Sequence, residues 1–104
     1  MVFTDTKPRF LPDHVTVKAG TVVFFLENVP GDSGPYFNPT HNLQVGPALD
    51  EVLAGTPDVK VGEKVTFTVE DLTPGTYVYW CSVPTLDQKD HARYGMVGML
   101  TVTP

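Results

Sequence analysis

The chain has 104 residues, of which 41% are hydrophobic and 18% are charged, and its formal net charge is −5 at pH 7. This length suits one domain, residues 1–104, with a single hydrophobic core, and the composition excludes a disordered chain. The acidic balance argues against a nucleic-acid partner, and no apolar run approaches the roughly 18 residues of a membrane span.

The first predicted strands lie in the amino-terminal part of the chain. Residues 14–20 alternate between polar and apolar side chains, which places Val15 and Val17 on one face. Residues 21–28 form a nearly continuous run of β-branched and aromatic residues, which is typical of a well-buried strand. The glycine between these segments predicts a tight turn.

Further strands are predicted after residue 40. Residues 40–45 form a short candidate, and only residues 48–55 have a composition that suits a helical turn or two. Three more strands are expected over residues 64–72, where Val65, Phe67 and Val69 face inward, and over 76–81 and 96–102. Prolines and glycines mark the turns between them. The pattern predicts an all-β antiparallel sandwich of about seven or eight strands.

The residues with the most informative chemistry lie near the end of the chain. Cys81 is the only cysteine, so it forms no internal disulfide, and His91 and Met96 follow it within sixteen residues. Thiolate, imidazole and thioether together are ligands for a soft metal, and two histidines, one cysteine and a weak axial methionine describe a blue-copper centre. A second imidazole must come from His14 or His41.

The motifs that surround these residues resemble the cupredoxin family. The early strand–turn–strand "HVTVKAGTVVFFLEN", the dipeptide "HN" at 41–42, the strand "LTPGTYVYWC" and the ending "GMVGMLTV" occur in the family's order and cover most of the chain. The resemblance implies a Greek-key sandwich with one type 1 copper bound by His41, Cys81, His91 and Met96. It leaves His14 as a structural or surface residue.

The resemblance also implies roles for residues around the metal. Asn42 is expected to form a hydrogen bond to the strand or loop near Cys81. Trp80 precedes Cys81 in a strand, so it is expected to point to the opposite face, as a surface aromatic that serves as a remote electron port. His91 is expected to be the adjacent electron port if its ring reaches solvent. The segment between Cys81 and His91 has nine residues. It is longer than in plastocyanin, azurin or auracyanin and comparable to that of the type 1 domain of copper nitrite reductases.

The function implied is that of a soluble one-electron carrier. Its redox partners are expected to present basic docking surfaces, and the protein is expected to be a monomer outside the cytoplasm (periplasm, thylakoid lumen or archaeal cell surface), with a signal or anchor removed. An alternative is a small copper enzyme in which the loop 82–90 opens the site to a nitrogen oxide. A thiol enzyme with a Cys–His pair and a structural zinc site are further alternatives, although neither uses the methionine.

Each residue also has a simpler interpretation. Cys81 and Met96 are apolar enough to be core residues, and His41 and His91 can be polar loop residues. The region from Gly46 to Gly62 carries no recognisable chemistry.

Overall fold

The computed structural model describes residues 2–4, 9–28, 40–84 and 96–104. These residues form strands and loops, and no helix that is long and apolar enough to cross a membrane occurs among them.

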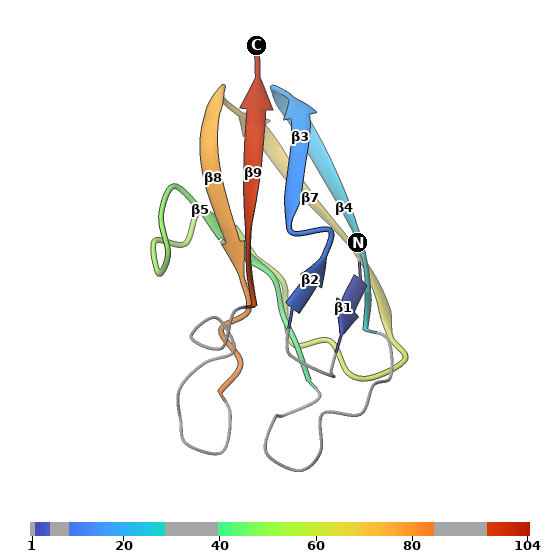
Figure 1. Ribbon diagram of the computed structural model, residues 1–104. Helices are drawn as coiled ribbons and strands as arrows, with labels where there is room; N and C mark the ends of the chain where they lie inside the picture. Colours follow the sequence, from blue (N-terminus) through green and yellow to red (C-terminus); the bar gives the residue numbers. More distant parts are fainter. Residues whose placement is uncertain (1, 5–8, 29–39, 85–95) are drawn as a thin grey trace.

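Figure 1 shows the strands as two facing layers. One sheet has the order β2-β1-β4-β7, and its strands are β1 (Val2–Thr4), β2 (Arg9–Leu11), β4 (Gly20–Asn28) and β7 (Lys64–Leu72). The other has the order β3-β9-β8-β5-β6, with β3 (His14–Lys18), β5 (Gln44–Gly46), β6 (Ala54–Gly55), β8 (Gly75–Trp80) and β9 (Val97–Thr103).

The predicted all-β sandwich is confirmed. Most neighbouring strands are antiparallel, whereas β1 pairs with β4 and β3 pairs with β9 in parallel. Nine strands occur among the described residues, more than the seven or eight expected. The strands that were not predicted individually, β1, β2 and β6, have three, three and two residues, which is too short for alternation to reveal them.

The prediction of a strand over residues 21–28 is confirmed by β4, but β4 is buried on one face only. Val22, Phe24 and Leu26 are buried against the core, but Val23 is 43% exposed and Phe25 is 67% exposed. An antiparallel sheet commonly packs one face on the core and leaves the other in water. The predicted inward face of β7 is confirmed, because its odd-numbered valines and phenylalanine are buried or half-buried while the intervening residues are exposed.

The helical turns expected in residues 48–55 are absent. The segment instead contains a hydrogen-bonded turn, in which the N–H of Glu51 donates to the carbonyl of Ala48 at 3.0 Å, and Asp50 has a φ of 68°. Asp is one of the few non-glycine residues that adopt this left-handed conformation readily. The segment ends in β6, which pairs with β5, so an eight-residue helix without tertiary support gives way to strand pairing.

Tyr79, a core residue, connects its sheet to the segment between β2 and β3. The strands β2 and β3 belong to different sheets and are separated only by Pro12 and Asp13. The hydroxyl of Tyr79 on β8 donates a hydrogen bond of 2.8 Å to the carbonyl of Pro12, and its ring packs edge-on against Phe10. Burial, with a smaller contribution from the Asp13 carboxylate, raises the pKa of Tyr79 to about 12.

Candidate metal centre

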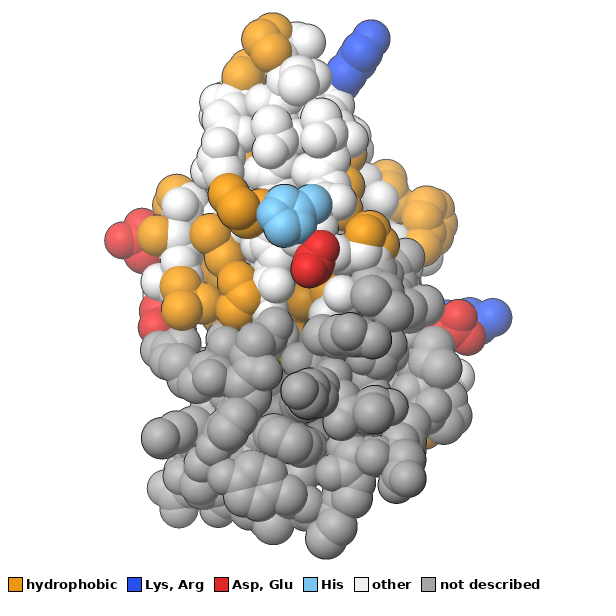
Figure 2. All heavy atoms as spheres, in the orientation of Figure 1, with side chains coloured by type: hydrophobic (Ala, Val, Ile, Leu, Met, Phe, Trp, Pro, Cys, Tyr) orange, Lys and Arg blue, Asp and Glu red, His pale blue; other side chains and the backbone are white. Residues whose placement is uncertain are grey.

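His41 is held in a buried position by backbone hydrogen bonds. It forms an antiparallel bridge with Val59, in which its N–H donates to the Val59 carbonyl at 3.0 Å and its carbonyl accepts from the Val59 N–H at 2.6 Å. Its exposed fraction is 0%. His14, by contrast, is exposed and lies 3.0 Å from the carboxylate of Asp13, and Figure 2 shows a histidine beside an acidic side chain on the surface. The expectation that His14 lies outside the metal site agrees with this position.

Cys81 follows directly after β8 and is also completely buried. Its side chain belongs to the same buried cluster as Tyr79 and Met96, which places it on the inner face of the sheet. Its N–H donates to the carbonyl of Met96 at 3.2 Å, so the two ends of the segment that connects them are hydrogen-bonded to each other. The backbone N–H of Asn42 lies 3.5 Å from Sγ and donates to it. A hydrogen bond of this kind stabilises a thiolate.

The structure brings the imidazole and the thiol together, although they are 40 residues apart in the sequence. Nδ1 of His41 lies 3.9 Å from Sγ of Cys81. Thiolate and imidazole ligands at about 2.3 and 2.0–2.1 Å from one ion, as at zinc, are about 3.7–4.0 Å apart when they subtend roughly 120–130°. The pair therefore has the separation of two ligands in a trigonal site on a single ion.

Met96, the predicted axial ligand, lies in the same buried cluster as Cys81. It immediately precedes β9, and its exposed fraction is 0%. The fourth predicted ligand, His91, lies outside the described residues. Among the residues that are described, no group of three or more His, Cys, Asp or Glu side chains is placed to hold a metal.

Asn42 makes the contacts that the resemblance implied. Its Nδ2 donates to Oγ of Ser82 at 2.9 Å, and its Oδ1 accepts from the N–H of Ser82 at 2.9 Å. These two bonds join the residue after His41 to the residue after Cys81. Asn42 therefore connects the segments that contain His41 and Cys81 both through its side chain and through its N–H bond to Sγ.

The expectation that Trp80 is a surface aromatic is wrong. Trp80 lies outside the inner cluster that holds Cys81, as strand alternation predicts, but its exposed fraction is 1%. Its neighbours across the strands are Gln44 and Val97, which are both half-buried. Removing a ring of this size from water is favourable, so burial of Trp80 stabilises the fold.

Sequence reasoning missed two residues that hold the His41 segment, Asn28 and Val59, and a separate buried contact at Thr56. The carbonyl of Val59 accepts hydrogen bonds from both His41 and the side chain of Asn28. Oγ1 of Thr56 accepts from the N–H of Leu43 at 3.0 Å. These contacts join segments that are far apart in the sequence. The sequence gives only one sign of them, which is that polar residues stand at the ends of apolar runs.

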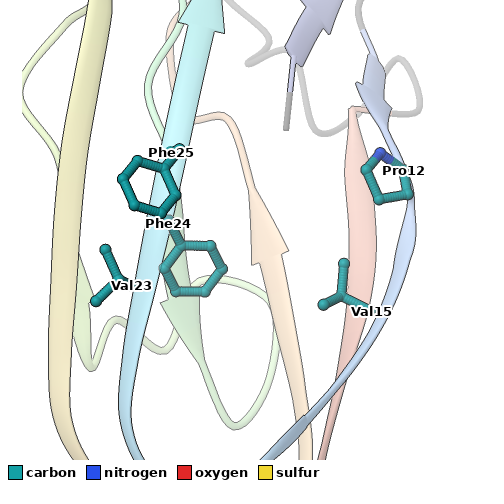
Figure 3. A pocket seen from close by; sticks show the side chains of 5 residues that line it. All are labelled: Pro12, Val15, Val23, Phe24 and Phe25. Atoms are coloured by element: carbon teal, nitrogen blue, oxygen red, sulfur yellow. The ribbon is translucent and has the colours of Figure 1, made fainter.

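A surface pocket of about 230 Å³ lies in a different place. Figure 3 shows the side chains that line it, which come from β3, β4 and the turn before β3: Pro12, Val15, Val23, Phe24 and Phe25. None of these residues carries a metal-binding or titratable group. The pocket is therefore separate from the site formed by His41 and Cys81.

A comparison with protein families agrees with the ligand chemistry. A family model described as copper binding proteins, plastocyanin/azurin family, matches residues 1–103. The chain belongs to this family of cupredoxins. Its cofactor is accordingly copper, as the resemblance predicted. A search of curated proteins found no match.

Solved structures of cupredoxins have the same fold. Auracyanin B is 21% identical, with a TM-score of 0.70 over 100% of this chain and 88% of that one. Plastocyanin from Dryopteris crassirhizoma is 22% identical, with a TM-score of 0.61 over 97% of this chain and 95% of that one. The copper nitrite reductase from Nitrosomonas europaea is 24% identical, with a TM-score of 0.66. The match includes 100% of this chain but only 38% of the reductase chain.

Proposed function

We propose that this cupredoxin is a type 1 copper protein that carries single electrons between redox partners, with His41, Cys81, His91 and Met96 as ligands. The observation that supports this most directly is the buried pair of donor atoms, Nδ1 of His41 and Sγ of Cys81, 3.9 Å apart. When bound to such donors, copper supplies a one-electron couple whose potential a weak axial thioether tunes.

The protein contributes a dry site of fixed geometry. The side chains of His41, Cys81 and Met96 have exposed fractions of 0%, so water has no access to the described ligands. The backbones on either side are anchored by the Val59 bridge and by the Cys81–Met96 hydrogen bond. Donors held in this way keep one arrangement in both oxidation states, which lowers the reorganisation that accompanies electron transfer.

Electrons must pass between the site and a partner at the surface. Trp80 is buried, so direct contact between its ring and a partner is not a route. We infer that His91 is the electron port, in a segment that borders the described part of the site. We further propose that the chain is a single domain and a monomer, that it works outside the cytoplasm, and that its net charge of −5 favours partners with basic docking surfaces.

A second candidate is a copper enzyme that acts on a nitrogen oxide. The similarity to part of the Nitrosomonas europaea reductase and the nine-residue segment between Cys81 and His91 favour it. The complete burial of the described ligands favours the carrier, because a substrate needs an open position on the metal.

The two functions are separated by one set of assays on the copper-loaded protein. A carrier takes up one electron per copper reversibly and exchanges it with a basic redox protein at a rate that falls as salt is added. It consumes no nitrite in the presence of a reductant. Sustained copper-dependent nitrite consumption would instead favour the enzyme, and failure to cycle between two oxidation states would contradict both.

A further inference from the structure

Asn28 is a buried polar residue outside the expected ligand set. It is the last residue of β4, and its exposed fraction is 0%. β4 belongs to one sheet, whereas β8, the strand that Cys81 follows, belongs to the other. Its Nδ2 donates a hydrogen bond of 2.8 Å to the carbonyl of Val59, 31 residues further along the chain. A buried side-chain amide that donates to a distant backbone carbonyl fixes the position of that carbonyl.

The carbonyl that Asn28 contacts is the one that holds His41. The His41 N–H donates to the same oxygen at 3.0 Å, and the Val59 N–H donates to the His41 carbonyl at 2.6 Å. The His41 N–H and the Asn28 side-chain amide therefore share the Val59 carbonyl oxygen as their acceptor. Asn28 also binds the chain beyond Val59 through its backbone, since its N–H donates to Glu63 and its carbonyl accepts from Gly62.

We propose that Asn28 is a positioning residue for the copper site. It acts through Val59 to hold the His41 backbone against the end of β4, and thereby sets how Nδ1 faces the sulfur of Cys81. Cys81 itself is anchored to the other sheet by its hydrogen bond to Met96. The Asn28 amide therefore fixes one ligand-bearing segment to the first sheet while the second sheet carries the other. This inference rests on the proposed copper function.

A substitution can remove the Nδ2 donor of Asn28. Asn28→Ala eliminates the Nδ2 donor but retains both backbone bonds of residue 28, so the end of β4 stays attached. Thr56→Val is the matched control, because it removes a different buried side-chain hydrogen bond from the same segment, the one that Oγ1 accepts from Leu43. Thr56 is 7% exposed and contacts neither Val59 nor His41 in the bonds described, so the two variants differ in which bond is lost.

The first measurement uses the copper-free protein. Amide hydrogen exchange at His41 and Val59 is expected to accelerate at least about tenfold in Asn28→Ala relative to Thr56→Val, after correction for global stability. Because no copper is needed, this result does not depend on whether the protein carries electrons. Equal protection of the two amides in both variants would overturn the proposal.

The second measurement uses the copper-loaded protein. Changes in groups that orient metal ligands typically lower metal affinity by about 10–100-fold. We expect copper release to a chelator to accelerate within this range in Asn28→Ala, together with a shifted copper EPR spectrum, whereas Thr56→Val keeps the wild-type spectrum. If Asn28→Ala fails to fold, Asn28→Ser is measured in its place. Identical spectra and release rates in wild type and the Asn28 variant, or equal changes in the Thr56 control, would refute a positioning role.

Discussion

Replacing Tyr79 by phenylalanine tests the connection between the two sheets. The phenol donates to the Pro12 carbonyl at 2.8 Å, and its pKa is raised to about 12 by burial and, to a smaller extent, by Asp13. In the unfolded chain the phenol has its ordinary pKa of about 10. The folded state therefore resists deprotonation of Tyr79, and the variant has no such group.

The sign of the effect reverses with pH. Below pH 10, Tyr79 is protonated in both states, and Tyr79→Phe loses one hydrogen bond, which is expected to destabilise the fold by about 1 kcal/mol. Between pH 10 and 12 the unfolded wild type gains stability by losing its proton while the folded state does not. A two-unit shift at about 1.4 kcal/mol per unit lowers the wild-type unfolding free energy by at most about 3 kcal/mol. The variant should become the more stable protein near pH 12.

Urea unfolding of the copper-free proteins between pH 7 and 12 measures this crossover. The other titrating groups, including the Cys81 thiol, are common to both proteins, so they cancel in the difference between the two curves. Parallel curves over the whole range would refute the raised pKa. A variant as stable as wild type at pH 7 would refute the stabilising role of the hydrogen bond to Pro12.

The remaining predictions concern the metal site and the core. Asn42→Ala removes both bonds to Ser82, so it should lower the unfolding free energy by about 1–3 kcal/mol and broaden the copper EPR signal. Ser82→Ala removes only the bond to Oγ and should lower the unfolding free energy by less than about 1.5 kcal/mol. The adjacent β4 residues should differ sharply in urea unfolding: Phe24→Ala should cost about 3–5 kcal/mol because the ring is buried, and Val23→Thr on the exposed face less than about 0.5 kcal/mol. A reversed order in either pair would contradict the assigned contacts.

The proposed ligand residues could be selected from the sequence because thiol, imidazole and thioether groups in this order match a blue-copper ligand set. Cys81, His41 and Met96 were identified from residue type and order, and the structure places the first two 3.9 Å apart and buries all three. The resemblance implied a hydrogen bond from Asn42 to the strand or loop near Cys81, and the structure shows two bonds from Asn42 to Ser82. His91 lies outside the described residues and stays a prediction.

Burial of individual side chains was harder to predict. Alternation gives the face on which a residue lies, but it does not say whether that face is covered. Trp80 lies on the outer face and is nevertheless buried, whereas Phe25, within an apolar run, is 67% exposed. In both cases the outcome depends on which other segment packs there, and local sequence contains no record of that.

The supporting contacts were not predictable for a related reason. Asn28 and Val59 are separated by 31 residues, and their hydrogen bond exists only because β4 ends beside the segment that pairs with His41. An asparagine at the end of an apolar run predicts a turn as readily as a buried amide. Only the tertiary arrangement distinguishes the two.

Titration of the metal-free protein with Cu(II) tests the central claim most directly. The account predicts uptake of one copper per chain with an intense visible sulfur-to-copper absorption, which disappears in Cys81→Ser and is greatly weakened in His41→Ala. Blue, green or purple would report how the loop 82–90 sets the geometry. A protein that stays colourless and takes up no copper, or a band that persists without the Cys81 sulfur, would contradict the account.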